Sequence, residues 1–225
     1  MKHLGCAGRR WVFLTLGLAG ALLGACSADD DASGAAGSAG AAGSAGAAGR
    51  AGAAGAAGGC AEGEVTLRND GFANGSQVGF QGGFAIGECF ASTFTPSACT
   101  FEPKSALVLI GGGDGGAADF DLAVLDVDGS GKPTTELART RVTLTGASDV
   151  LSEIPLDSLK LTDRDGAPFA IALCHVTHAG APSIGRDSDG LTPDRNYIYT
   201  GGAWQEASTL GVEGDWILRA KLEVK

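Results

Sequence analysis

Basic residues are scarce in this chain, and they form no basic patch. Its 225 residues include 16 lysines and arginines against 26 aspartates and glutamates, which gives a net charge of −10 at neutral pH. Three of the basic residues and none of the acidic ones lie before Cys26, so residues 26–225 carry 13 − 26 = −13. Nucleic acids and anionic lipid headgroups are bound through clustered lysine and arginine. The composition therefore excludes nucleic acid as a partner.

The common catalytic and metal-binding motifs are also missing. The chain has no Walker phosphate-binding loop, no His-Glu-x-x-His motif and no Cys-x-x-Cys pair. Only His175 and His178 follow Cys26, and positions three apart on one strand point to opposite faces, so they do not share a metal. Residues 181–185 approach the G-x-S-x-G nucleophile elbow, but alanine replaces its first glycine. We therefore expect no enzymatic activity.

No apolar run is long enough to span a bilayer comfortably. The longest one extends from Trp11 to Leu23 and follows a basic segment with Lys2, Arg9 and Arg10. A transmembrane helix needs about 20 apolar residues, whereas an export signal combines a basic segment with a shorter apolar run. Residues 1–25 therefore predict a cleaved signal peptide, with an uncleaved membrane anchor as the alternative.

The predicted signal ends in Leu23-Gly24-Ala25-Cys26. This short run of small residues closing at a cysteine resembles the lipobox of bacterial lipoproteins, in which the cysteine becomes the lipidated first residue. The resemblance implies a diacylglyceryl group on Cys26, and each buried methylene contributes about 0.8 kcal/mol to a membrane anchor. Ser27 stands where an aspartate would resemble an inner-membrane retention signal. The resemblance therefore implies a lipoprotein of the cell envelope, in the outer membrane.

Residues 26–59 are almost entirely glycine, alanine and serine, a composition that cannot build a core. Glycine recurs at every third position from Gly34 to Gly58, which is the period of collagen, but the segment contains no proline. We predict a disordered, flexible tether with a root-mean-square span of about 30 Å. Its Gly-Ala-Ala and Gly-Ser-Ala triplets after a lipobox resemble the spacers of myxobacterial-type lipoproteins.

Residues 60–225 are predicted to form one domain of short strands. Residues 119–124 alternate polar or small side chains with apolar ones, and the end of the chain places Trp216, Leu218 and Val224 on one face. Turn signals containing glycine, asparagine and aspartate separate these runs, and no helices alternate with them. The pattern predicts an all-β fold, an antiparallel β-sandwich, of which a jelly roll is one form.

The end of the chain also resembles a known type of module. Residues 214–220, preceded by residues 187–190 and 201–204, are similar to the close of sandwich modules appended to secreted bacterial proteases and adhesins. The resemblance implies an accessory or binding module and carries over no catalytic residue.

Four cysteines follow Cys26, namely Cys60, Cys89, Cys99 and Cys174. An even set in an exported protein predicts two disulfides, and four cysteines allow three connectivities. We expect Cys89 to pair with Cys99 across a short loop, and Cys60 with Cys174. The alternative is a four-cysteine zinc site, which the lack of a Cys-x-x-Cys pair opposes.

One turn-rich stretch predicts a calcium site, with Asp187, Asp189, Asp194 and Asn196 as candidate ligands. Calcium takes six to eight oxygens from side chains and carbonyls, although aspartate and asparagine are also ordinary loop residues. Residues 126–131 open like an EF-hand loop but lack its glutamate at the required position, so we expect a hairpin turn there.

Aromatic rings on a sandwich surface suggest sugar binding. Trp204 follows two glycines, so we predict that Trp204 and Tyr197 provide a stacking surface for a ligand, whereas Trp216 belongs to the core. The alternative for Trp204 is a ring that caps the sandwich.

The leading hypothesis is a non-enzymatic envelope lipoprotein, anchored to the membrane by lipid, that presents a β-sandwich to a glycan or protein ligand. The first alternative is an exported hydrolase whose active site draws on Asp119, Asp121, His175 or Ser183. The second is a purely structural envelope protein that associates through an exposed apolar patch. Sandwich folds support all three roles.

Overall fold

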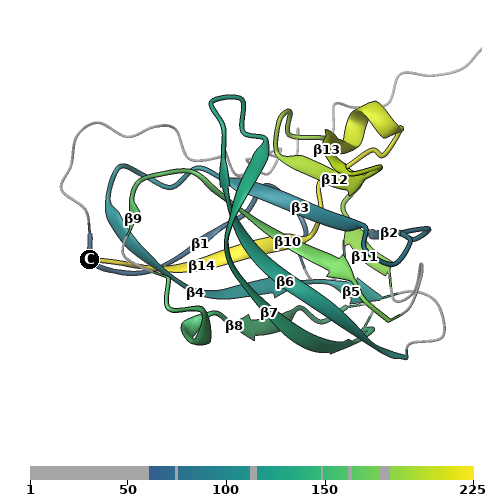
Figure 1. Cartoon of the computed structure of the whole chain (residues 1–225), viewed down its shortest axis with the longest axis horizontal. Coiled ribbons are helices and arrows are strands. Elements are labelled where there is room, and N and C mark those ends of the chain that lie inside the picture. Colours follow the sequence, from purple (N-terminus) through teal and green to yellow (C-terminus); the bar gives the residue numbers. More distant parts are fainter. Residues whose placement is uncertain (1–60, 74–75, 112–115, 148, 162–163, 178–182) are drawn as a thin grey trace, which may run out of the picture. The chain divides into compact units, whose positions relative to one another are not determined.

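Antiparallel strands make up almost all of the regular structure in this protein (Figure 1). A computed structural model describes residues 61–225 apart from 74–75, 112–115, 148, 162–163 and 178–182. This part contains fourteen strands and two short 3-10 helices, η1 (Asp157–Leu159) and η2 (Ala207–Leu210). The strands pack as a sandwich, which confirms the predicted all-β fold. The predicted signal peptide, lipidated Cys26, tether and Cys60 lie outside the described residues.

The larger layer is a six-stranded sheet in the order β13-β12-β3-β10-β6-β7. Its strands are β13 (Ala203–Glu206), β12 (Asn196–Thr200), β3 (Cys89–Phe94), β10 (Phe169–His175), β6 (Ala117–Val127) and β7 (Pro133–Thr145). The central strands β3 and β10 are buried along their whole length. The strands β6 and β7 form a long hairpin, and Asp128 Oδ1 accepts hydrogen bonds from the backbone N–H groups of Ser130 and Lys132 in its turn. The hairpin turn expected at residues 126–131 is therefore confirmed.

The opposing layer has the strand order β1-β14-β4-β8, with β9 also paired to β4, and a small third sheet has the order β2-β11-β5. The strands of the opposing layer are β1 (Gly63–Leu67), β14 (Leu218–Val224), β4 (Thr100–Val108), β8 (Ser152–Pro155) and β9 (Arg164–Asp165). Those of the third sheet are β2 (Gly79–Gln81), β11 (Ser183–Arg186) and β5 (Ile110–Gly111). Neither helical turn in the described part of the chain has the length or apolar character of a transmembrane helix.

Aromatic contacts join the two layers. The ring of Phe169 lies 5.6 Å from the rings of both Phe94 and Phe101, measured between centroids. Since Phe94 and Phe169 belong to the six-stranded sheet and Phe101 to β4, these contacts cross the sandwich. Trp216 is fully buried beside Phe90, as predicted. Burying each such side chain contributes about 1.5–3 kcal/mol.

A buried ion pair fixes the segment after β1, residues 69–73, to strand β14. The side chain of Asp70 is fully buried and accepts hydrogen bonds from Arg219 Nε at 3.0 Å and from the backbone N–H of Phe72 at 3.1 Å. The N–H of Gly71 donates to Asp187 Oδ2 at 2.7 Å. Removing one partner of such a pair leaves an uncompensated buried charge, so loss of either Asp70 or Arg219 should destabilise this attachment.

The outer face of the layer containing β14 is a solvated, ion-paired surface. Lys221 lies 3.1 Å from Glu64 of β1 and 3.2 Å from Glu153 of β8. Glu102 lies 3.1 Å from Lys104 on the same face. Cross-strand pairs of opposite charge are typical of a sheet face that meets water.

Candidate binding site

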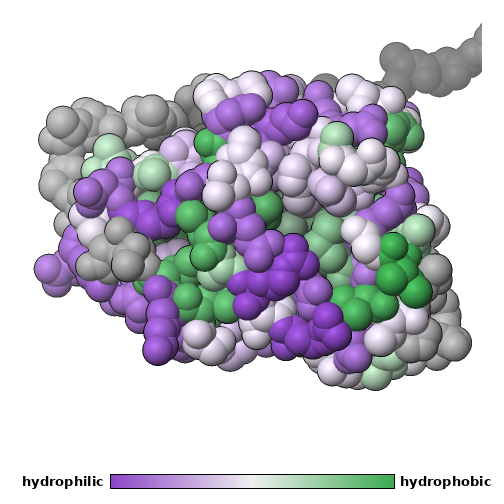
Figure 2. All heavy atoms as spheres, in the orientation of Figure 1, coloured by the Kyte–Doolittle hydropathy of each residue, from purple (hydrophilic) through white to green (hydrophobic). Residues whose placement is uncertain are grey.

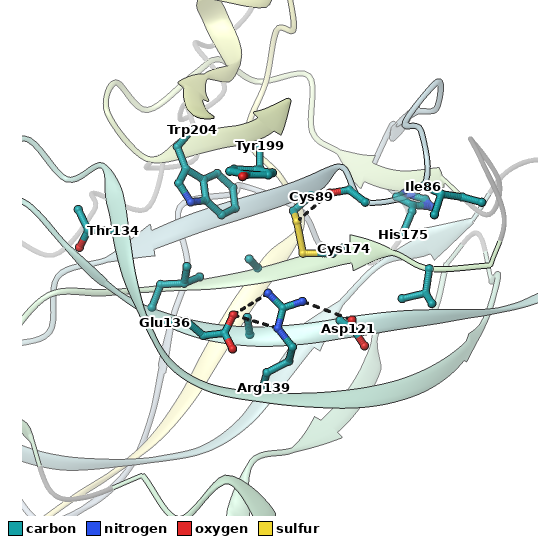
Figure 3. Close-up of a pocket in the computed structure, with 15 residues that line it drawn as sticks. Ile86, Cys89, Asp121, Thr134, Glu136, Arg139, Cys174, His175, Tyr199 and Trp204 are labelled. Atoms are coloured by element: carbon teal, nitrogen blue, oxygen red, sulfur yellow. Dashed lines mark hydrogen bonds and ion pairs between the residues drawn. A yellow bond between two sulfur atoms is a disulfide. The ribbon is translucent and has the colours of Figure 1, made fainter. Parts of the chain in front are cut away.

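The outer face of the six-stranded sheet is hollowed over its middle strands (Figure 3). This hollow has a volume of about 420 Å³, within the range of small-ligand sites. Its floor consists of the small side chains Ala123 and Ala172 together with Leu125, Cys89 and Cys174. Four strand spacings separate β12 from β7, so the two sides of the hollow lie roughly 19 Å apart at the backbone.

A disulfide between Cys89 and Cys174 forms part of the floor. The expected pairing of Cys89 with Cys99, and of Cys60 with Cys174, is therefore wrong. The strands β3 and β10 are neighbours, and their register places Cys89 directly opposite Cys174. Cys99 is also disulfide-bonded, but it directly precedes β4 of the other layer and so is carried away from Cys89. Disulfides persist in oxidising compartments, so this bond indicates an extracytoplasmic location.

Two aromatic rings form one wall of the hollow. Tyr199 and Trp204 are directly paired across β12 and β13, with ring centroids 5.3 Å apart and planes inclined at 61°. Both side chains are half-buried, so part of each ring remains accessible. The structure thus places the predicted Trp204 in the hollow.

Tyr197 does not line the hollow, although it was predicted together with Trp204. Its side chain is buried, and its hydroxyl donates to the backbone oxygen of Ser130 at 3.5 Å. Burial, with the nearby carboxylates of Asp194 and Glu206, raises the pKa of Tyr197 to about 12. Tyr197 and Tyr199 are two apart in β12 and so share a face, which means that strand alternation could have added Tyr199 to the prediction but could not have excluded Tyr197.

Three charged residues form the opposite wall. Arg139 donates through Nε and Nη2 to Glu136 Oε2 at 2.9 and 2.6 Å, and through Nη1 to Asp121 Oδ2 at 3.3 Å (Figure 3). Arg141 donates to the other oxygen of Asp121 at 2.8 Å. Hydrogen bonds from Arg141 first, and from Arg139, hold the pKa of Asp121 below its ordinary value. Sequence reasoning did not single out Arg139, because nothing local in β7 shows that it faces a cavity.

Of the residues named for a hydrolytic site, Asp121 and His175 border the hollow, but Asp119 and Ser183 do not join them. Asp121 lies in the hollow, while Asp119 accepts a hydrogen bond from the Thr143 hydroxyl at 2.7 Å. The ring of His175 stacks on Phe84 at 5.3 Å, on the core side of the sheet. Ser183 is buried in β11 of the small third sheet. His178 lies outside the described residues.

The candidate calcium ligands divide between different places. Asp187 accepts hydrogen bonds from two backbone N–H groups, those of Gly71 at 2.7 Å and Asp215 at 2.8 Å. Asn196 Oδ1 accepts from the backbone N–H of Trp216 at 3.1 Å. Asp194 lines a separate cavity beside the β6–β7 turn. Asp187 and Asn196 thus hold loops together.

Asp189 lies beside Asp187 and is exposed. Among the described residues, no group of three or more His, Cys, Asp or Glu side chains is arranged to hold a metal ion. Calcium binding stays a prediction for experiment.

The fold and the hollow together define an extracytoplasmic β-sandwich module with a candidate ligand site. No protein-family model matches the chain, and no curated protein matches it. Among solved structures, the chain is similar to a variant of the clostridial cysteine protease Cwp84 after propeptide cleavage. That match has a TM-score of 0.53 and 13% identity, and it covers 72% of this chain and 40% of that one.

A second solved structure contains the cysteine protease and lectin-like domains of Cwp84, a surface layer associated protein of Clostridium difficile. It matches with a TM-score of 0.48 and 14% identity, over 66% of this chain and 36% of that one. The chain thus spans about two fifths of the Cwp84 chain at most. At this identity the likeness shows a shared fold with part of Cwp84 and carries over no residue or activity.

Proposed function

We propose that this chain is a non-enzymatic lipoprotein of the cell envelope whose β-sandwich binds a saccharide in the hollow. The observation that supports this function best is the difference between the two outer faces of the sandwich. The face of β14 carries cross-strand ion pairs, as a solvated face does. The outward positions of the six-stranded sheet instead carry alanine, leucine, tyrosine and tryptophan beside a charged wall.

Figure 2 shows apolar side chains among hydrophilic ones across the middle of the molecule, over the strands of the six-stranded sheet. The floor residues Ala123, Ala172 and Leu125 are at most 5% exposed, so the half-buried rings of Tyr199 and Trp204 supply the apolar surface that a ligand would cover. An apolar floor bounded by a few convergent polar groups is the ordinary form of a small-ligand site. The composition of this face therefore favours a bound ligand over bulk water.

The two walls of the hollow suit the two surfaces of a sugar ring. A pyranose has apolar C–H faces and a rim of hydroxyl groups. The rings of Tyr199 and Trp204 offer a surface for the C–H face, while Asp121, Glu136 and Arg139 offer hydrogen bonds to the hydroxyl rim. A peptide is the rival ligand, and it has no such division between an apolar face and a hydroxyl rim.

Two features support a binding role over hydrolysis. A catalytic general acid needs a raised pKa, whereas the pKa of Asp121 is lowered by its hydrogen bonds with Arg141 and Arg139. The ring of His175 also turns to the core side of the sheet, although this residue borders the hollow, and Ser183 lies in the small third sheet.

The proposed location combines the lipobox with the disulfide. The Cys89–Cys174 bond indicates export. The resemblance of Leu23-Gly24-Ala25-Cys26 to a lipobox supports lipidation of Cys26, and Ser27 after it supports the outer membrane. The glycine- and alanine-rich residues 26–59 would then hold the module away from the membrane surface.

A glycan array tests the proposed function directly. The full-length chain is applied to the array and to isolated envelope polysaccharide, once with calcium and once with a chelator. Binding in both buffers supports saccharide binding in the hollow that needs no metal ion. Binding that disappears with the chelator supports the saccharide function and the calcium prediction together. Absence of binding to every saccharide in both buffers would overturn the proposal.

A further inference from the structure

The charged wall of the hollow holds hydrogen-bonding groups that no other described residue uses. A guanidinium has five N–H groups, and among the described residues three of those on Arg139 donate to Glu136 and Asp121. Two N–H groups of Arg139 therefore remain for a ligand. Among the described residues, Glu136 accepts hydrogen bonds only through Oε2. Its Oε1 therefore remains as an acceptor close to the two remaining N–H groups of Arg139.

The wall carries no excess of positive charge. Its three lining residues, Asp121, Glu136 and Arg139, sum to 1 − 2 = −1, and Arg141, which is exposed beside the hollow and donates to Asp121, brings the ion-paired group to 2 − 2 = 0. His175 also lines the hollow, but its ring packs against the core. The wall therefore does not attract an anion, and the whole chain, with a net charge of −10, opposes one.

Adjacent hydroxyl groups match this arrangement better than charged groups do. A hydroxyl both donates and accepts, so its oxygen takes an N–H of Arg139 while its hydrogen goes to Glu136 Oε1. A carboxylate only accepts and adds a negative charge beside Asp121 and Glu136. An ammonium only donates and meets the guanidinium. Either charged group leaves part of the wall without a partner, which costs affinity when water is displaced.

We propose that the hollow selects neutral saccharides with adjacent hydroxyl groups over their acidic counterparts, and that Arg139 and Glu136 determine this preference. The proposal rests on the saccharide-binding function of the same site. Arg139 is held on both sides by carboxylates, so it acts as a donor of hydrogen bonds and not as a free positive charge (Figure 3).

The test uses an array of paired sugars presented to the full-length chain. Each neutral hexose oligomer is paired with its 6-carboxylate form: oligogalactose with oligogalacturonate, oligoglucose with oligoglucuronate, and oligomannose with oligomannuronate. We expect the preferred neutral oligomer to bind at least tenfold more tightly than its acidic partner. Glu136→Gln removes one negative charge from the wall, so it should reduce the ratio of the neutral to the acidic affinity at least fivefold.

Glu153→Gln is the matched control, because Glu153 is an exposed carboxylate on the opposite face of the sandwich. It should leave the ratio unchanged, and circular dichroism checks that both variants are folded. Preferred or equal binding of the acidic partner would overturn this inference while leaving the saccharide function intact. A ratio unaffected by Glu136→Gln would overturn the role of the Arg139–Glu136 pair. Absence of binding to every pair would overturn the saccharide function itself.

Discussion

Removing the Cys89–Cys174 disulfide should lower the stability of the protein by a predictable amount. The bond joins residues 85 apart in the sequence. In the chain-entropy model, closing a loop of that length in the unfolded state contributes about 4.6 kcal/mol to the free energy of unfolding. Alanine at both positions removes the cross-link and replaces little of its contribution. The double substitution Cys89→Ala/Cys174→Ala should therefore lower the free energy of unfolding by about 4 kcal/mol.

Urea denaturation of the oxidised protein and of the double variant, followed by far-ultraviolet circular dichroism, measures this difference. The dependence of unfolding free energy on urea should also be steeper in the variant, because its unfolded chain exposes more surface. Proteolysis without reductant, followed by mass spectrometry, should recover a peptide containing Cys89 linked to one containing Cys174. A stability loss below about 1 kcal/mol, or a Cys89–Cys99 peptide, would refute the reasoning.

Two further predictions concern buried carboxyl groups. Asp70→Asn leaves Arg219 without its charged partner and should lower the free energy of unfolding by about 3 kcal/mol. The double variant Asp70→Asn/Arg219→Met should recover much of that loss. Urea denaturation measures both variants, and equal instability of the two would contradict this prediction. Burial, assisted by Asp189, raises the pKa of Asp187 from 3.8 to about 7. The folded state thus holds a proton that the unfolded chain releases, so the contribution of Asp187 to stability falls as pH rises from about 4 to about 7. Asp189→Asn should flatten this fall in urea midpoints between about pH 4 and 7, and an unchanged slope would contradict the coupling.

The strands were predictable because they follow local rules. On β14, alternate residues are buried from Leu218 to Val224, as the two-residue period requires. The turn at Asp128 was predictable because aspartate and glycine are typical turn residues, and its side chain bonds the backbone within four positions. Such features depend on residues that are close in the sequence.

Strand partners were not predictable, and the disulfide shows why. Cys89 begins β3, and the loop after β3 crosses from one layer to the other, so the length of the strand and the loop carry Cys99 away from Cys89 although the two are close in the sequence. Cys174 reaches Cys89 because β10 pairs with β3. No local pattern in a single sequence specifies that pairing.

The candidate site was predictable only in part for the same reason. Trp204 was found because an aromatic residue after two glycines is conspicuous in the sequence. Arg139 was not predicted because its place in the site depends on the pairing of β7 with β6, which puts Asp121 beside it. The hollow joins residues from six strands, and its walls become visible only when the sheet is assembled.

Titration of the full-length chain with the neutral oligosaccharide that binds best on the array tests the central claim most directly. Trp204 is half-buried in the wall of the hollow, and truncating such an aromatic anchor typically costs about 2 kcal/mol. Trp204→Ala should therefore raise the Kd about 30-fold. Val150→Ala, which shortens an exposed apolar side chain outside the hollow, should leave it unchanged. A Trp204→Ala protein that keeps the wild-type Kd would contradict saccharide binding in the hollow.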